Sequence, residues 1–236
     1  MRGTALMSKT SLTGRHRFCC GLLLIVVGSA CSSRPTPEQQ LATLEAELLN
    51  SPTLTVSFEV IATGAFAAEL RGTLTIMDDD QTSLRADGSF GGEPVSLHLD
   101  STDTGLVGGN GDNQFAVAQP AALREALIIG LTRMGILHNL ARLTSVQLPD
   151  HADGGVQNWV QADSLTGGGD SLSFSIIVAG QPSGEATLLF SDPQTLLGRE
   201  QVVNFPGGSM QVTESYTITS SGTGISSVSL ISSMTM

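Results

Sequence analysis

The chain has 236 residues with 22 acidic and 11 basic side chains, and its formal charge is −11 at pH 7. Residues 1–30 contain four of the basic residues and no acidic one, so the 206 residues that follow carry a charge of −15. A surface this acidic repels phosphate groups, which excludes nucleic acid as a partner bound through its backbone.

The first thirty residues have the pattern of a secretory signal. Four basic residues precede an unbroken apolar stretch over residues 18–27, and three small residues follow at 28–30. The apolar stretch is too short to cross a bilayer core of roughly 30 Å as a helix. A basic region, a short apolar region and small residues before a cleavage point predict export and removal of residues 1–30.

Cys31 directly follows these small residues. The segment Gly28–Cys31 resembles the lipobox of bacterial lipoproteins, in which the cysteine receives a diacylglycerol and the signal is then removed. The resemblance implies a lipid anchor on Cys31, and the alternative is ordinary cleavage that leaves a soluble protein with one free thiol. Ser32 follows the cysteine, and by resemblance to the sorting rule of bacteria with two membranes this implies the periplasmic face of the outer membrane.

Residues 31–37 form the expected lipidated tether, and residues 38–236 are expected to form a single domain. A helix begins where the tether ends, because Thr36 can cap it, Pro37 suits its first position and Gln39 completes a capping box. The leucines that share one face of this helix are Leu41, Leu44 and Leu48.

Four segments of alternating apolar and polar residues come next. They cover residues 54–60, 70–76, 84–87 and 95–100. Segments of this kind in succession predict an antiparallel meander with one apolar and one polar face. Asp78–Asp80 is interpreted as a hairpin loop, residues 103–113 as a loop rich in Gly, Asp and Asn, and residues 115–118 as a short strand.

A second amphipathic helix is predicted from Pro120 to about Leu143. Its glycines, Gly130 and Gly135, each weaken it by about 1 kcal/mol relative to alanine. The residues on its apolar stripe are Leu123, Leu127, Leu131, Met134 and Leu137. After a loop over 149–155, a second set of strands is predicted. They cover residues 156–162, 172–178, 186–190, 201–205, 210–218 and 225–231.

This order of elements resembles the LolA-like proteins, a group of periplasmic lipoprotein carriers and related lipoproteins. The matching segments are Val56–Glu59, Arg71–Ile76, Leu84–Arg85 and Leu189–Glu200, in the order and spacing of the family. The resemblance implies an α+β, mainly β fold, in which an incomplete antiparallel β-barrel forms a curved half-barrel sheet. Helices cover its concave face, and the apolar interior holds acyl chains.

By this resemblance, the apolar positions that face one way become candidates for lining a lipid cavity. They are Val56, Phe58, Leu70, Leu74, Leu97, Leu127, Leu131, Met134, Phe174, Ile176, Leu188 and Val212. Arg85 is the candidate for contacting a lipid headgroup, with a surface ion pair as the alternative. The alternative for the whole set is that these side chains pack against one another as a dry core.

Two features separate this chain from the soluble carriers. Carriers have Arg-Pro in the hairpin where this chain has Asp78–Asp80, and this chain has the features of an anchored protein. The nearer analogy is therefore the anchored lipoproteins of the same fold. The leading hypothesis is a lipid-binding lipoprotein that aids transport of a lipid or another lipoprotein, and the alternative is a ligand-free structural or interaction lipoprotein.

No pattern of catalytic residues stands out. The segment Asp150–Asp153 contains His151 but lacks a second nearby histidine, so a solvated loop is a better interpretation than a metal site. The spacing of Asp78–Asp80 is not that of an EF-hand. His98 and His138 are interpreted as surface or core residues. The sequence therefore predicts no enzyme activity, no metal and no cofactor.

Overall fold

The computed structural model describes residues 34–77, 81–119, 122–144 and 155–221. Contacts divide the chain into residues 1–34 and residues 35–236, and all helices and strands of the described part belong to the second unit. The predicted signal, Cys31, the Asp78–Asp80 loop, most of the loop at 149–155 and the strand predicted over 225–231 lie outside the described residues.

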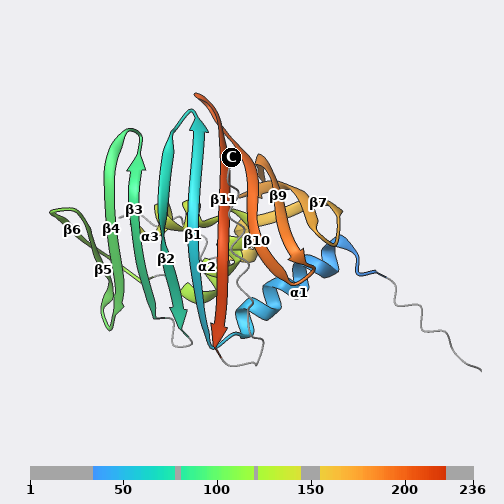
Figure 1. Ribbon diagram of the computed structural model, residues 1–236, viewed down its shortest axis with the longest axis horizontal. Coiled ribbons are helices and arrows are strands. Elements are labelled where there is room, and N and C mark those ends of the chain that lie inside the picture. Colours follow the sequence, from blue (N-terminus) through green and yellow to red (C-terminus); the bar gives the residue numbers. More distant parts are fainter. Residues whose placement is uncertain (1–33, 78–80, 120–121, 145–154, 222–236) are drawn as a thin grey trace, which may run out of the picture. The chain divides into compact units, whose positions relative to one another are not determined.

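In the described residues, eleven antiparallel strands form one curved sheet (Figure 1). The first half of the chain supplies β1 (Thr53–Gly64), β2 (Ala68–Met77), β3 (Thr82–Phe90), β4 (Glu93–Thr102), β5 (Gly105–Asn110) and β6 (Asn113–Val117). The second half supplies β7 (Val160–Gly167), β8 (Ser171–Val178), β9 (Gln181–Asp192), β10 (Thr195–Phe205) and β11 (Gly208–Ser221). Each half is a meander of consecutive hairpins.

The two meanders meet in the middle of the sheet, where β1 pairs with β11 from Thr53↔Ser221 to Gly64↔Met210. The order across the sheet is β6-β5-β4-β3-β2-β1-β11-β10-β9-β8-β7. Within the described residues, β6 and β7 are the edges and do not pair with each other, so the sheet is an open half-barrel.

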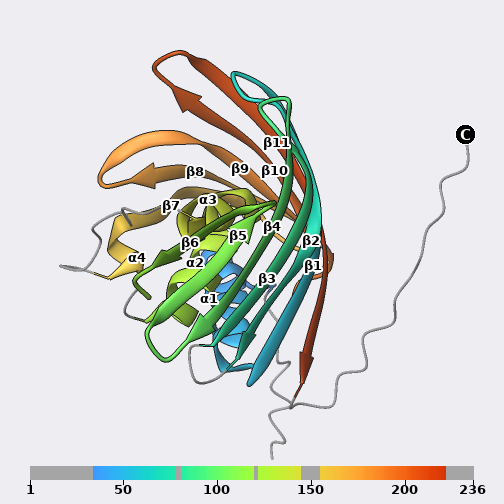
Figure 2. The ribbon, with the colours of Figure 1, turned by 90° about the vertical axis from the view of Figure 1, so that its left-hand side faces the viewer.

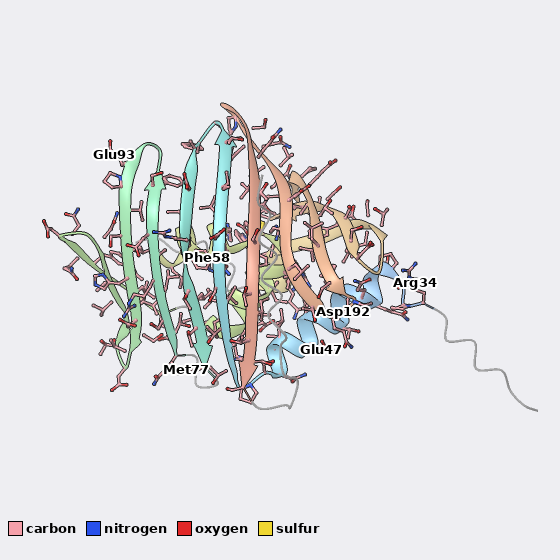
Figure 3. All side chains as sticks on the ribbon, in the orientation of Figure 1. Arg34, Glu47, Phe58, Met77, Glu93 and Asp192 are labelled. Carbon is pink, nitrogen blue, oxygen red and sulfur yellow. The ribbon has the colours of Figure 1, made fainter. Side chains whose placement is uncertain are left out.

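The helices lie on the concave side of the sheet (Figure 2). They are α1 (Pro37–Asn50), α2 (Leu123–Arg133), α3 (Ile136–Thr144) and the short α4 (Val156–Trp159). The β1–β2, β3–β4 and β10–β11 hairpins extend past the helices at one end of the sheet, which we call the rim. Glu93 lies at the rim, and Met77 lies at the opposite end (Figure 3).

Side-chain alternation gives the sheet its two faces, as the sequence predicted. On β1, Val56, Phe58 and Val60 are buried, whereas Ser57 and Glu59 are exposed. All members of the hydrophobic core cluster lie between Leu41 and Tyr216 in the chain. Residues 35–236 therefore contain the whole described core, and the predicted half-barrel fold with helices on its concave face is confirmed.

The first helix is also confirmed. The Thr36 hydroxyl accepts a hydrogen bond from the Gln39 amide at 3.3 Å, and the Gln39 side chain accepts one from the Thr36 amide at 3.0 Å. This reciprocal arrangement is the predicted capping box. The buried face of the helix contains Leu41, Leu44 and Leu48, and it also buries two polar side chains, Gln40 and Glu45.

Three local predictions were wrong. Residues 103–113 form most of a hairpin, because the backbone of β5 and β6 pairs along its length despite a composition typical of loops. The segment 156–162 begins as the helical turn α4 and becomes strand only at Val160. The helix predicted to run from Pro120 to Leu143 is two helices, which are separated at Met134 and Gly135.

Candidate functional site

A pocket of about 790 Å³ lies between the concave face of the sheet and α3. The sheet supplies a largely apolar wall from strands β2, β3, β4, β10 and β11. Its members are Leu70, Ala86, Val95, Leu97, Gln201, Val203 and Met210. Asn110 and Phe115, from the β5–β6 hairpin, line the pocket toward one edge of the sheet.

The opposite wall is formed by α3 and by Met134, which lies in the break between α2 and α3. Its members are Met134, Leu137, His138, Leu140, Ala141 and Thr144. Most of these side chains are apolar, so the pocket presents hydrocarbon on both walls. Pockets of 300–1,000 Å³ with apolar walls and a few polar groups are typical of sites that hold small molecules or cofactors.

Three phenylalanines from different hairpins line the pocket at the rim. Phe66 follows β1, and Phe90 and Phe205 end β3 and β10. The Phe66 ring stacks on Phe90 with centroids 6.3 Å apart and meets Phe205 edge to face at 5.6 Å. Their exposed fractions are 47%, 42% and 37%. Large exposed aromatic rings that gather at a cavity are characteristic of interaction sites.

The position of the helical wall is set by two buried charged residues that are direct partners on β10 and β11, Arg199 and Glu214. The Arg199 guanidinium donates hydrogen bonds to the carbonyl oxygens of Leu131, Thr132 and Arg133 at 3.1–3.3 Å, at the end of α2. A cation at this place satisfies carbonyls that have no partner within the helix and complements the helix dipole. Burial lowers the pKa of Arg199, but a guanidinium stays protonated in proteins.

Glu214 holds the start of α3 in the complementary way. Its carboxylate accepts hydrogen bonds from the backbone amides of Ile136 at 2.8 Å and Leu137 at 3.0 Å, and from the Tyr216 hydroxyl. Burial and, after it, the charge of Glu214 raise the pKa of Tyr216, so the hydroxyl remains a donor. An anion at a helix N-terminus is favourable for the same electrostatic reason.

The helices are also tied to one another and to the sheet. The Glu45 carboxylate of α1 receives two hydrogen bonds of 2.8 Å from Arg133 of α2. Arg124 donates to the carbonyl oxygens of Leu48, Leu49 and Ser51 at the end of α1. The buried Gln40 amide exchanges two hydrogen bonds with the backbone of Gly169, beside β8. These contacts fix the helices in place away from the rim.

Within the residues that line the pocket, two buried polar atoms have no hydrogen-bond partner among the described residues. They are Nε2 of His138 and Oε1 of Gln201, and both are inaccessible to solvent. The His138 ring lies 5.6 Å from the Trp159 ring, measured between centroids. Burial, followed by the nearby charges of Arg142 and Arg199, lowers the pKa of His138 to about 4. The imidazole is therefore neutral at pH 7.

The pocket lies closer to the rim than the cavity predicted from the sequence. Of the twelve predicted residues, Leu70, Leu97 and Met134 line the pocket. The other nine are buried in the core below it and are not among its lining residues. They are Val56, Phe58, Leu74, Leu127, Leu131, Phe174, Ile176, Leu188 and Val212. Phe58, for example, lies near the middle of the sheet (Figure 3), where α2 and α3 cover the concave face.

Arg85 lies on the opposite face of the sheet and does not line this pocket. Its guanidinium forms a 2.8 Å ion pair with Asp100, and the two side chains are 53% and 47% exposed. The hydrogen bond from Arg85 lowers the pKa of Asp100. Because neighbouring residues of a strand point to opposite faces, Leu84 and Ala86 face the concave side and Arg85 cannot. The surface ion pair, the alternative for this residue, is what the structure contains.

Sequence reasoning missed Arg199, Gln201 and the three rim phenylalanines. A signal for the first two was present, because Arg199, Gln201, Val203 and Phe205 have the same parity along β10 and therefore share a face. Glu214 was visible as an interruption of the apolar alternation in β11. The phenylalanines belong to three separate hairpins, so their meeting depends on the sheet order.

The described part of the chain was also compared with the requirements of a metal site and of a membrane-spanning helix. Its His, Cys, Asp and Glu side chains include no group of three that could hold a metal ion. None of its helices is long and apolar enough to cross a membrane.

No protein-family model matches the sequence, and no curated protein matches it. Among solved structures, the crystal structure of LprF from Mycobacterium bovis is similar to this chain at 12% sequence identity and a TM-score of 0.41. The match covers 78% of this chain and 94% of that one. A likeness at this level carries no conclusion about what this chain does.

Proposed function

We propose that this chain is an exported lipoprotein that binds a lipid acyl chain in the pocket between the sheet and α3. In this proposal, a lipid on Cys31 anchors the protein to the periplasmic face of the outer membrane. A protein in this position could receive or deliver a lipid, or another lipoprotein through its acyl chains, within the cell envelope. The proposal assigns the protein no catalytic step.

One observation carries the proposal: an apolar pocket of about 790 Å³ whose rim is lined by three exposed phenylalanines. The bound chain would lie along Leu70, Leu97 and Val203, with α3 on its other side, and would leave the pocket past Phe66. Side chains that only completed a core would pack against one another and leave no space of this size, because protein interiors are close-packed.

The energetics favour an acyl chain over a small polar ligand. Each methylene transferred from water to an apolar site contributes about 0.8 kcal/mol, so ten methylenes contribute about 8 kcal/mol. Association and ordering of the chain offset several kcal/mol of this gain. Affinities between millimolar and micromolar therefore follow for ten buried methylenes. Few hydrogen bonds are needed, and few polar groups line the pocket.

The test is native mass spectrometry with lipid extraction on residues 32–236, exported to the periplasm behind a signal without a lipobox. We expect a lipid to co-purify in stoichiometric amount. A variant with Ala141→Trp should lose it, because this exposed alanine lines the pocket and a tryptophan there fills the space. Ala116→Trp is the matched control, since Ala116 is exposed on β6 and does not line the pocket.

A stable domain that purifies without lipid, and binds none when lipid is added, would reject the proposal. The protein would then be a ligand-free structural or interaction lipoprotein of the same fold. Loss of lipid in both tryptophan variants would reject this pocket as the lipid site, because the effect would not depend on filling the pocket.

The anchor has its own test in the full chain. Mass spectrometry of the mature N-terminus should detect acyl groups on Cys31, and Cys31→Ala should abolish them together with membrane association. Ser32→Asp should move the protein from the outer to the inner membrane, if Ser32 is the sorting residue. A mature protein cleaved near Ala30 with a free thiol would instead support the soluble alternative.

A further inference from the structure

Most of the large exposed apolar side chains lie at the rim. The described residues include seven such side chains, and five belong to the three hairpins that project past the helices (Figure 2). These five are Ile61, Phe66, Phe90, Val202 and Phe205. The other two, Val107 and Leu197, lie near the starts of β5 and β10, at the opposite end of the sheet. Exposed apolar groups that gather in one place mark a surface that contacts a protein or a membrane.

The apolar side chains surround the hairpin ends instead of covering one face of them. Phe90 and Phe205 line the pocket and therefore lie on the concave side. Ile61 and Val202 alternate with buried neighbours, which places them on the convex side of the sheet. A folded partner protein would cover one side of these hairpins, whereas the hydrocarbon of a bilayer contacts a projecting hairpin on every side. The arrangement therefore favours a bilayer as the partner.

The hairpin tips carry no charge. Residues 63–68, 88–92 and 203–210 contain no Asp, Glu, His, Lys or Arg, although the chain after residue 30 has a formal charge of −15. The charged residues that directly flank these tips in the sequence are all acidic. They are Glu69, Asp87 and Glu93. Because acidic groups are repelled by anionic headgroups, the rim suits a bilayer of zwitterionic lipids.

Backbone hydrogen bonds join the three tips to one another. The Ala65 amide donates to the Ser209 carbonyl oxygen at 2.9 Å, and the Gly91 amide donates to the Ala67 carbonyl oxygen at 2.8 Å. The β1–β2 hairpin lies between the other two, so these bonds link all three. Pro206, in the third turn, has no amide hydrogen to satisfy. Paired backbone groups lower the cost of leaving water, because hydrocarbon offers no hydrogen bonds.

We propose that the rim is a membrane-docking surface, whose three hairpin tips insert into the interfacial layer of a zwitterionic bilayer. Phe66 is the centre of the inserted patch, because its ring contacts both Phe90 and Phe205. Apolar groups at such surfaces reach about 5–10 Å into the boundary between headgroups and acyl chains. This inference goes beyond the proposed function, because docking requires the exposed rim and no ligand in the pocket.

Vesicle binding tests the proposal on residues 32–236, which lack the lipid on Cys31. Sedimentation with phosphatidylcholine vesicles should show binding that does not weaken with added salt, because charge attraction does not contribute. Added anionic phosphatidylglycerol should weaken it. Phe66→Ala should lower the partition coefficient roughly fivefold, the effect of burying about half of a phenylalanine side chain. Alanine at all three phenylalanine positions should lower it roughly a hundredfold.

Two controls separate the rim from general hydrophobicity and from the pocket. Leu197 is 46% exposed, against 47% for Phe66, but lies at the other end of β10 from Phe205. Leu197→Ala should therefore change vesicle binding less than twofold. Ala141→Trp fills the pocket and leaves the rim unchanged, so it should also bind vesicles within twofold of the unsubstituted chain. Loss of vesicle binding in Ala141→Trp would overturn this inference, because uptake of lipid into the pocket would then explain the association.

Insertion is tested by fluorescence in a Trp159→Phe background, which removes the single tryptophan of the chain. Phosphatidylcholine brominated near the start of its acyl chains should quench the fluorescence of Phe66→Trp but not that of Leu197→Trp. Equal quenching of the two would overturn the inference, and so would a dimer in solution that Phe66→Ala dissociates, since the rim would then bind a second copy.

The outcomes for the rim and for the pocket are distinguishable. A domain that co-purifies with lipid but does not bind vesicles would overturn the docking surface and leave the proposed function standing. A lipid-free domain that binds vesicles through Phe66 would support the docking surface and reject the proposed function.

Discussion

Arg199 and Glu214 carry opposite charges, are 0% and 1% exposed, and occupy one cross-strand position in the middle of the sheet. Burying a charged group costs free energy because the group loses its hydration. Here a helix end and the neighbouring opposite charge both offset that cost for each group. The ion pair of Arg85 and Asp100 is half exposed, so it contributes at most about 1 kcal/mol to the free energy of unfolding. At the residue scale, losing one member of the buried pair should therefore lower the free energy of unfolding more than losing one member of the surface pair.

Replacing Glu214 by Gln tests this conclusion. The variant keeps the size of the side chain but removes the charge that faces α3 and leaves Arg199 without its compensating anion. We expect the free energy of unfolding to fall by about 3–5 kcal/mol, as measured by urea denaturation. In a double-mutant cycle, Arg199→Met with Glu214→Leu should be much less destabilising than the sum of the single changes. Additive losses would contradict the coupling.

His138 makes stability depend on pH above the range in which carboxylates titrate. Its pKa is about 4 in the folded protein, against 6.5 in an unfolded chain. Because the unfolded state binds the proton first, stability falls as the pH falls from 6.5 toward 4. We expect the free energy of unfolding to decrease by about 1.3 kcal/mol between pH 7.5 and 5.5. The His138→Phe variant should lack this decrease, and an equal decrease in the variant would assign it to another group.

At the scale of elements, the break between α2 and α3 positions the pocket wall. Gly135 has φ +91°, and a Cβ at this residue would lie 2.5 Å from a carboxylate oxygen of Glu214. Glycine adopts this backbone conformation readily, whereas other residues are strained in it. The same position therefore lets the chain turn between the helices and lets Glu214 approach the amides of α3.

Gly135→Ala should consequently destabilise the protein by about 2–3 kcal/mol, through strain at positive φ and the clash with Glu214. Gly207→Ala is the control, because a Cβ there meets no atom within 4 Å. Its expected effect on the melting temperature is small. The Gly135→Ala variant should also bind less lipid at temperatures where it is folded, since α3 forms one wall of the pocket. Similar melting temperatures for both variants would show that Gly135 is not constrained.

At the scale of the whole molecule, the sheet depends on pairing between β1 and β11, which are about 150 residues apart in the chain. This central pairing joins the two meanders and places Phe66, Phe90 and Phe205 at one rim. The outer strands contribute less, because β6 pairs only with β5 in the described structure.

Two proline substitutions distinguish the centre from the edge. Thr213 pairs with Ile61 on one side and Glu200 on the other, so Thr213→Pro removes a ladder hydrogen bond and should cost about 3 kcal/mol or more. Gln114 follows the two-residue turn between Asn110 and Asn113, which places its amide on the side away from β5. Gln114→Pro should therefore be tolerated. Equal losses, measured by thermal unfolding, would contradict the strand order.

The sequence by itself determined the elements whose signals are local. Alternation at Val56, Phe58 and Val60 depends only on the period of a strand, and the Thr36 capping box only on residues three positions apart. The family resemblance supplied the half-barrel and its covered face. Local patterns also showed which side chains are buried. They could not show whether a buried side chain packs against other side chains or lines a pocket.

Tertiary structure decided the rest, because the remaining features depend on contacts between distant segments. Leu74 and Leu97 both alternate with polar neighbours on a strand, yet only Leu97 lines the pocket, since α2 and α3 fill the concave face away from the rim. The helix break at Gly135 follows from Arg199 and Glu214, more than 60 residues later in the chain. His138 and Gln201 line one pocket only because α3 lies over the concave face of the sheet.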